Sequence, residues 1–276
     1  MRRGQGATAA EKMKPIARMS QAIAVEAKGE GRPVVLLHGL GADSSQLLTA
    51  LPPTIGYRYF YPDVPGHGRT PLDAFGFAHF ADRVQALLDR EGVARAVIGG
   101  ISMGAAIALR LALDAPDRVA GLILIRPSWL DRPARPHLGL VARVGGWQIA
   151  TPEGAAARLE ADAEYQAIAR ENPAAAASVR GLLTRPQAME AAVVLSAMVD
   201  DRPFAPLDVL AAIRCKALVV SNDGDPLHPV AIAREIAARL PRAALRHIPS
   251  RYLEPTAHVA ALREAVAQFL NELGEF

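Results

Sequence analysis

A series of short apolar runs, separated by longer amphipathic stretches, restricts the fold of this chain more than any other feature. The segment "PVVLLHG" at 33–39 is apolar through its first five residues. A continuous apolar run of this length is typical of a strand that is covered on both faces of a sheet. Five further runs predict strands at 57–63, 94–100, 119–127, 216–223 and 244–250.

Helical patterns fill the intervals between these runs, at 43–51, 77–91, 103–115, 229–240 and 256–273. Strands that alternate with helices form a mostly parallel sheet with helices on both faces. The sequence therefore predicts an α/β fold with a doubly wound sheet. Residues 22–31 predict one antiparallel edge strand, and the polar residues 1–20 predict a flexible N-terminal tail.

The alternation stops between residues 128 and 205. This stretch has alanine-rich helical patterns that are interrupted by prolines, and it has no strand pattern. Its apolar spacing is amphipathic, which favours packed helices over a loose linker. We therefore predict a helical cap insertion at 128–205 over the carboxyl edge of the sheet. The two parts of the core are then 21–127 and 206–276.

Composition excludes several classes of function. The 276 residues carry a net charge of only +3, with scattered Lys and Arg, which argues against a nucleic-acid partner. No apolar run is long enough to span a membrane or to act as a signal peptide, so we expect a cytoplasmic protein without a membrane partner. The single cysteine, Cys215, excludes an internal disulfide and a cysteine-rich metal site. A monomer and a homodimer both remain open.

The segment "GISMG" at 100–104 carries the first indication of chemistry. Ser102 follows a predicted buried strand, precedes a predicted helix, and has glycine two residues away on each side. A sharp strand-to-helix turn leaves little room for side chains near the turning residue, which favours glycine at these positions. The turn exposes the hydroxyl, and the N–H of Met103 at the helix start is suited to stabilise an oxyanion. Ser102 is therefore a candidate nucleophile.

A serine nucleophile needs a base, and the base needs a carboxylate to orient it. Loops after the carboxyl ends of parallel strands meet at one edge of the sheet. His258, which follows the last predicted strand, is our preferred base, and the loop residue His228 is an alternative. Asp225 is the preferred carboxylate because it begins the proline-stiffened segment "DPLHP". Asp223 and Asp131 are the alternatives.

The order Ser102, Asp225, His258 resembles that of α/β-hydrolase fold proteins with a helical cap. Three further stretches resemble the same family: "LLHGLG" at 36–41, "DVPGHGRT" at 63–70 and "GDPLHP" at 224–229. The resemblance covers 30–273 apart from the insertion. It implies a second oxyanion N–H at Leu40 and a bracing role for His38. The chain departs from the family at Ala257, where glycine is usual before the histidine, and in the length of the loop "PSRYLEPTAH".

The resemblance implies a serine hydrolase that acts on a carboxylic ester, lactone or thioester of a small molecule. His258 would take the proton of Ser102, Asp225 would orient the histidine, and an acyl-enzyme would form and be hydrolysed. No metal or cofactor is implied. Trp129 and Trp147 are candidate walls of the substrate pocket, and Arg126 is a candidate partner for a substrate carboxylate. Other serine-triad reactions, or a binding protein without turnover, are the competing interpretations.

Overall fold

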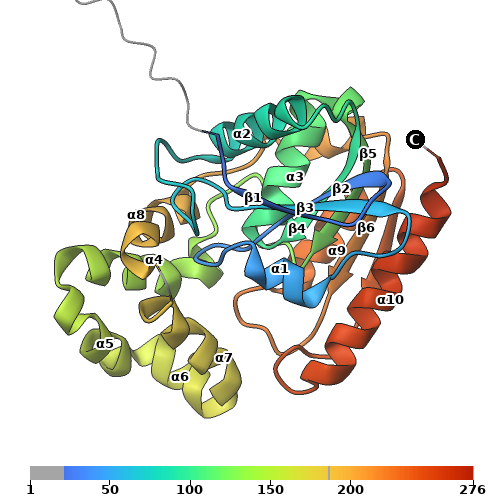
Figure 1. Ribbon diagram of the computed structural model, residues 1–276. Coiled ribbons are helices and arrows are strands. Elements are labelled where there is room, and N and C mark those ends of the chain that lie inside the picture. Colours follow the sequence, from blue (N-terminus) through green and yellow to red (C-terminus); the bar gives the residue numbers. More distant parts are fainter. Residues whose placement is uncertain (1–21, 186, 276) are drawn as a thin grey trace, which may run out of the picture.

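The structure is a computed structural model that describes residues 22–185 and 187–275. The predicted N-terminal tail at 1–20 lies outside the described residues. A central sheet is covered by helices on both faces, and a group of helices lies beside it (Figure 1). The prediction of an α/β fold with a mostly parallel, doubly wound sheet is confirmed.

The sheet has seven strands in the order β1-β3-β2-β4-β5-β6-β7. The antiparallel edge strand predicted within 22–31 is present as β1, which pairs with β3, and every other pairing is parallel. Neighbouring carboxyl ends therefore meet at one edge. The strands are β1 (Val25–Lys28), β2 (Arg32–Leu37), β3 (Tyr57–Pro62), β4 (Ala96–Ile101), β5 (Val119–Ile125), β6 (Lys216–Ser221) and β7 (Ala243–His247).

Two apolar layers enclose the sheet. In β2, Val34 and Leu36 face one layer, while Val35 and Leu37 face the other, as the twofold repeat of a strand requires. The first layer is completed by α1 (Ser45–Ala50) and α10 (Pro255–Leu273). The second is completed by α2 (Phe77–Arg90), α3 (Met103–Asp114) and α9 (Val230–Arg239). Burial on both faces explains why the strands read as continuous apolar runs.

Five helices connect β5 to β6 and form the group beside the sheet (Figure 1). The first and last of them, α4 and α8, pack against each other and against the same apolar layer as α3. The helices are α4 (Arg135–Ala150), α5 (Pro152–Ala161), α6 (Ala163–Glu171), α7 (Pro173–Arg180) and α8 (Ala188–Ala197). They all fall within the stretch in which the sequence shows helical patterns and no strand.

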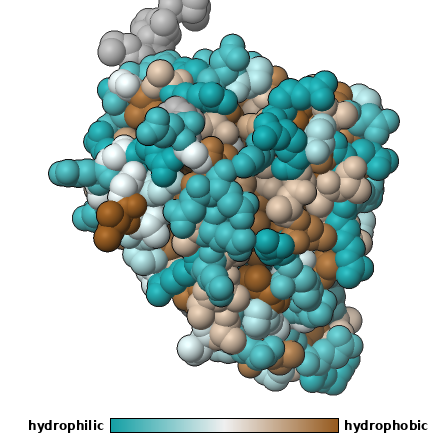
Figure 2. Space-filling view, turned by 90° about the vertical axis from the view of Figure 1, so that its right-hand side faces the viewer, coloured by the Kyte–Doolittle hydropathy of each residue, from teal (hydrophilic) through white to brown (hydrophobic). Residues whose placement is uncertain are grey.

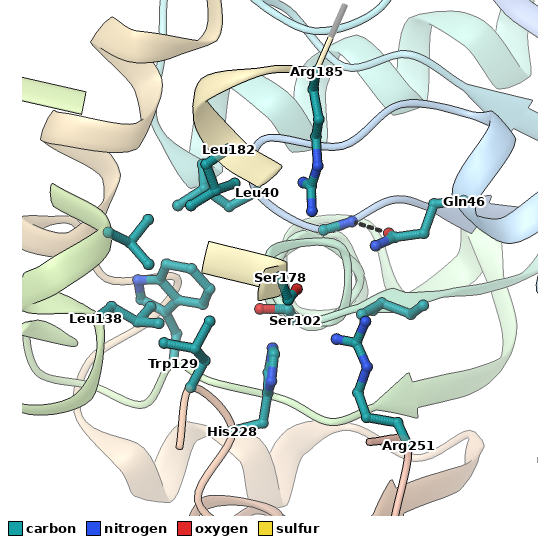
Figure 3. A pocket seen from close by; sticks show the side chains of 14 residues that line it. Leu40, Gln46, Ser102, Trp129, Leu138, Ser178, Leu182, Arg185, His228 and Arg251 are labelled. Atoms are coloured by element: carbon teal, nitrogen blue, oxygen red, sulfur yellow. Dashed lines mark hydrogen bonds between the residues drawn. The ribbon is translucent and has the colours of Figure 1, made fainter. Parts of the chain in front are cut away.

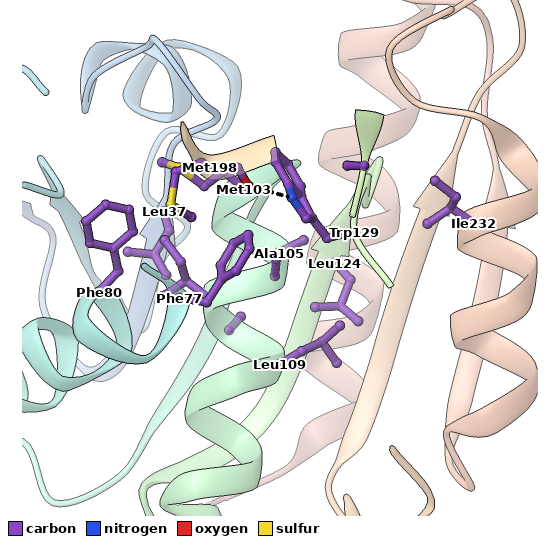
Figure 4. Close-up of a cluster of buried hydrophobic side chains, with 14 of the residues drawn as sticks. Leu37, Phe77, Phe80, Met103, Ala105, Leu109, Leu124, Trp129, Met198 and Ile232 are labelled. Carbon is purple, nitrogen blue, oxygen red and sulfur yellow. Dashed lines mark hydrogen bonds between the residues drawn. The ribbon is translucent and has the colours of Figure 1, made fainter. Parts of the chain in front are cut away.

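Trp129 joins this helical group to the core (Figure 4). Its ring meets that of Phe77 edge-on, with the ring centroids 5.4 Å apart. Its indole Nε1 donates a hydrogen bond of 3.2 Å to the carbonyl of Met198, so the one polar atom of a buried ring is satisfied. The insertion is thereby packed onto the sheet instead of being tethered loosely to it.

The outer surface is that of an ordinary globular chain. On the face shown in Figure 2, hydrophilic side chains cover most of the area, and apolar ones lie in small groups between them. Among the described residues, none of the helices is both long and apolar enough to cross a bilayer.

Candidate active site

Ser102 occupies a strained turn between β4 and α3. Its backbone has φ 56° and ψ −109°, an unfavourable region for a residue with a side chain. The turn is held by a 2.9 Å hydrogen bond from the Ser102 N–H to the carbonyl of Ile125 on the neighbouring strand. The Ser102 carbonyl also accepts from the N–H groups of Ala105 and Ala106. The structure thus contains the sharp strand-to-helix turn that the sequence predicts.

Two glycines allow the turn to pack closely against β2. A Cβ on Gly104 would lie 2.1 Å from the carbonyl oxygen of Leu37, and a Cβ on Gly100 would lie 2.4 Å from the same atom. Both contacts are with backbone, which cannot move aside as a flexible side chain can. Glycine is required at both positions by the close approach of two chain segments.

We expect Gly104→Ala to destabilise the fold by about 2 kcal/mol or more, because the added methyl group overpacks the turn against the carbonyl of Leu37. Urea unfolding followed by circular dichroism measures this loss. Gly146→Ala is the matched control, because a Cβ there meets nothing within 4 Å. Equal stability of the two variants would contradict the packing argument.

The loop after β2 presents Leu40 beside Ser102. The N–H of Gly39 donates to Oε1 of Gln46 at 2.8 Å, and the N–H of Gly41 donates to Nε2 of His67 at 3.1 Å. These bonds fix the loop on both sides of Leu40, which itself lines the cavity at Ser102. Met103 is the first residue of α3, so its N–H has no acceptor within its own helix.

Two buried histidines support this loop in their neutral form. Nε2 of His38 accepts the N–H of Val64 at 3.1 Å, and Nδ1 lies 2.9 Å from the carbonyl of Gly39, to which it donates. Burial lowers the pKa of His38, and it lowers the pKa of His67 to about 3. The contacts of His38 agree with the bracing role that the family resemblance implies.

A cavity opens at Ser102, with an empty volume of about 550 Å³ that includes its mouth. Its walls come from the loop after β2, the turn at Ser102, the helical insertion and two loops at the carboxyl edge of the sheet (Figure 3). The lining residues are Gly39, Leu40, Gln46, Ile101, Ser102, Trp129, Leu138, Val141, Ser178, Leu182, Arg185, Leu227, His228 and Arg251.

The histidine in this cavity is His228. It comes from the loop between β6 and α9, and its ring points toward Ser102 in Figure 3. Nδ1 of His228 lies 2.9 Å from Oδ2 of Asp225. The two groups are close but not aligned for a hydrogen bond, so the contact is electrostatic. Burial lowers the pKa of His228, against the opposing effect of Asp225. The imidazole is thus held neutral, as a general base must be.

Asp225 is buried and surrounded by positive or donating groups. Oδ2 also lies 3.2 Å from NH1 of Arg126, and Oδ1 accepts the N–H of Leu227 at 3.2 Å. Burial by itself raises the pKa of Asp225, but His228 and Arg126 together lower it below its usual value. The carboxylate is therefore ionised. Arg126, a candidate partner for a substrate, is itself buried against Asp225 and does not line the cavity.

Among the residues that the structure describes, no hydrogen bond or ion pair joins His258 to Ser102 or to Asp225. His258 is the fourth residue of α10, and its Nδ1 lies 2.8 Å from the carbonyl of Pro249, to which it donates. In a triad this nitrogen faces the carboxylate. The loop between β7 and α10 instead sends Arg251 into the cavity. In the described part of the chain, Nδ1 of His258 thus contacts the carbonyl of Pro249 in place of Asp225, although the charge of Asp225 still opposes the lowering of the His258 pKa by burial.

The alternative carboxylates also lie elsewhere. Asp223 pairs with His247 at 3.1 Å on an exposed part of the surface. Oδ2 of Asp131 accepts the N–H of Leu207 at 2.9 Å. Of the two tryptophans, Trp129 lines the cavity, whereas Trp147 is partly buried against the core and is not among the lining residues.

Sequence reasoning did not single out Arg185 or Arg251, and it ranked His228 below His258. The position of His228 three residues after Asp225 was the available indication, because it keeps both side chains on one loop. Among the residues in 22–185 and 187–275, no cluster of His, Cys, Asp and Glu is arranged to hold a metal ion.

Comparison with known proteins agrees with this architecture. The family model for the alpha/beta hydrolase fold matches residues 32–252, so the chain belongs to that family. It is 28% identical over 233 residues to the magnesium-chelatase 30 kDa subunit of Rhodobacter capsulatus, covering 81% of each chain. It is 32% identical over 229 residues to the pimeloyl-[acyl-carrier protein] methyl ester esterase of Aromatoleum aromaticum, covering 77% of this chain and 87% of that one.

A solved structure with the same fold is that of a thermophilic esterase from Thermogutta terrifontis. Its TM-score is 0.73 at 24% identity, and the match covers 92% of this chain and 94% of that one. At this identity the likeness shows the fold alone. Taken together, the family and its relatives support hydrolase activity for the chain.

Proposed function

We propose that the protein hydrolyses a carboxylic ester, lactone or thioester of a small molecule, with Ser102 as the nucleophile. The observation that carries the proposal is the strained turn at Ser102, which opens into a cavity that also contains His228 and Leu40. A backbone held in an unfavourable conformation requires support from its surroundings, and such strain is concentrated at functional sites. The esterase among the relatives is consistent with this class of substrate.

In the proposed reaction, Nε2 of His228 takes the proton from Ser102 as the hydroxyl oxygen attacks the carbonyl carbon. The N–H groups of Leu40 and Met103 stabilise the oxyanion of the tetrahedral intermediate. The C–O bond to the leaving group then breaks, and His228 donates the proton to the departing oxygen. Water attacks the acyl-enzyme by the same route and releases the acid.

We assign the base to His228 in preference to His258. Nδ1 of His228 faces the ionised Asp225, which leaves Nε2 as the free nitrogen. Arg126 donates to the same carboxylate oxygen, Oδ2, at 3.2 Å and limits its movement. Nδ1 of His258 is occupied by the carbonyl of Pro249. A carbonyl can fix a tautomer, but it lacks the full negative charge that stabilises an imidazolium.

A ligand-binding protein without turnover is the second candidate, and one contact favours it. The hydrogen-bond partner of the Ser102 hydroxyl is Ser128 Oγ, at 3.4 Å, and not an imidazole. Contacts between a catalytic hydroxyl and its base are often long without substrate, so the contact with Ser128 is compatible with Ser102 as the nucleophile.

Burst kinetics with p-nitrophenyl butyrate separate the two candidates. A hydrolase with an acyl-enzyme intermediate releases about one equivalent of p-nitrophenol per active site before steady turnover when deacylation is the slower step. A fluorophosphonate probe then labels the peptide that contains Ser102, as read by mass spectrometry. If neither turnover nor labelling is seen, and a ligand raises the melting temperature, the binding protein is the better description.

A further inference from the structure

Two arginines face the cavity from opposite sides (Figure 3). Arg185 follows α7 in the helical insertion, and Arg251 lies in the loop between β7 and α10. Neither guanidinium has a carboxylate within 4 Å among the described residues, whereas Arg180, close by in the insertion, pairs with Glu160 at 2.6 Å. The described residues that line the cavity include no Asp or Glu.

The protein balances the positive charges near the cavity only in part. Burial lowers the pKa of Arg185 and repulsion from Arg251 lowers it further, against the smaller opposing effects of Asp43 and Tyr252. The same two effects, in the same order, lower the pKa of Arg126 to about 10. Asp225 is already paired with Arg126. Partly buried cations are costly when no anion accompanies them, so an anionic group in the cavity would stabilise this arrangement.

Contacts with the protein hold both arginines in position for such a group. NH1 of Arg185 donates to the carbonyl of Gly41 at 2.7 Å, which fixes the guanidinium beside the loop after β2. The Arg251 guanidinium lies over the ring of Tyr252, 4.6 Å from its centroid. A guanidinium has five N–H donors in a planar fork that matches a carboxylate. Most of these donors remain available to a ligand.

We propose that the substrate carries a carboxylate in addition to the ester, and that Arg185 and Arg251 bind this carboxylate while Ser102 attacks the ester. This inference rests on the proposed function and makes it more specific. The second carboxylate belongs either to the acyl part or to the leaving group. Both cases have the same recognition chemistry, so the substrates of the test distinguish them.

Two pairs of esters differ in this charge and in one methyl group. For the acyl side, the p-nitrophenyl monoester of adipic acid is compared with the mixed methyl p-nitrophenyl diester. For the leaving-group side, 4-acetoxybenzoate is compared with its methyl ester. We expect kcat/KM of the charged member to exceed that of its neutral partner by about tenfold or more in at least one pair. If kcat/KM of the charged ester is equal to or lower than that of its neutral partner in both pairs, the inference is overturned.

Arginine variants test whether this preference comes from the two side chains. Arg185→Gln and Arg251→Gln should each reduce the ratio of charged to neutral ester toward one, and Arg185→Lys and Arg251→Lys should retain part of it. Arg180→Gln is the matched control, because its partner is Glu160 outside the cavity. A ratio that survives both glutamine variants also overturns the inference. The ratio compares two substrates of the same variant. A general loss of activity, caused by disturbance of the loop that contains Gly41, therefore cancels.

Failure of the proposed function gives a different result, namely no turnover of any of the four esters. The anion site is then tested by calorimetric titration of adipate into the wild type and the same variants. Binding that is weakened about tenfold or more by either glutamine variant, but not by Arg180→Gln, supports the site. Absence of adipate binding to the wild type overturns it.

Discussion

Replacement of Ser102 by alanine is expected to lower kcat/KM for p-nitrophenyl butyrate by about 10⁴- to 10⁶-fold, which leaves only the contribution of the oxyanion donors and of binding. The loss is this large because no acyl-enzyme can form without the hydroxyl oxygen. The burst of p-nitrophenol should also disappear. Initial rates and stopped-flow traces at matched protein concentration measure both effects.

Ser128→Ala is the matched control for this experiment. The Ser128 hydroxyl lies 3.4 Å from that of Ser102, and it donates to the carbonyl of Leu227 at 2.9 Å. Its loss should reduce kcat/KM by less than about tenfold, because a neutral hydrogen bond contributes about 1 kcal/mol. Ser102→Ala should retain the wild-type melting temperature, because alanine keeps the Cβ and the backbone of the turn, and the lost hydroxyl donates only a 3.4 Å hydrogen bond. Equal hydrolysis by Ser102→Ala and wild type would contradict the proposed nucleophile.

The second large effect is expected at His228. His228→Gln should lower kcat/KM by about 10³-fold or more, because Ser102 loses its general base. His258→Gln should lower it by less than about tenfold, because the imidazole of His258 contacts the carbonyl of Pro249 and does not line the cavity. The two variants remove the same chemical group from two segments that follow strands at the same edge of the sheet, so each controls for the other.

The pH dependence gives a readout that a purely structural role does not change. The base must be neutral, and burial lowers the pKa of His228 below the usual value of 6.5. We therefore expect kcat/KM to be constant above pH 6.5 and to fall as the pH drops through the lowered pKa. If His258→Gln loses activity and His228→Gln keeps most of it, His258 is the general base, as the family resemblance implies.

Local sequence patterns were sufficient for the fold and for the strained turn at Ser102. Continuous apolar runs mark strands that are buried on both faces, and each predicted core strand is present within a few residues of its expected bounds. Ser102 was identifiable because the turn depends on its immediate neighbours, with glycine at positions 100 and 104 to avoid the carbonyl of Leu37. Periodicity and close backbone contacts between neighbouring strands are properties of short segments, so a single sequence carries them.

The choice of base and the charge of the cavity depended on tertiary structure. His228 and His258 both follow strands at the same edge, and sequence order favoured His258. Only the start of α10 at Pro255 and the course of the preceding loop determine that Arg251 enters the cavity while His258 faces the backbone. Arg185 and Arg251 belong to different segments, and neither has a local pattern that predicts their meeting. Side-chain direction at a loop is set by contacts with distant parts of the chain, which no short stretch of sequence encodes.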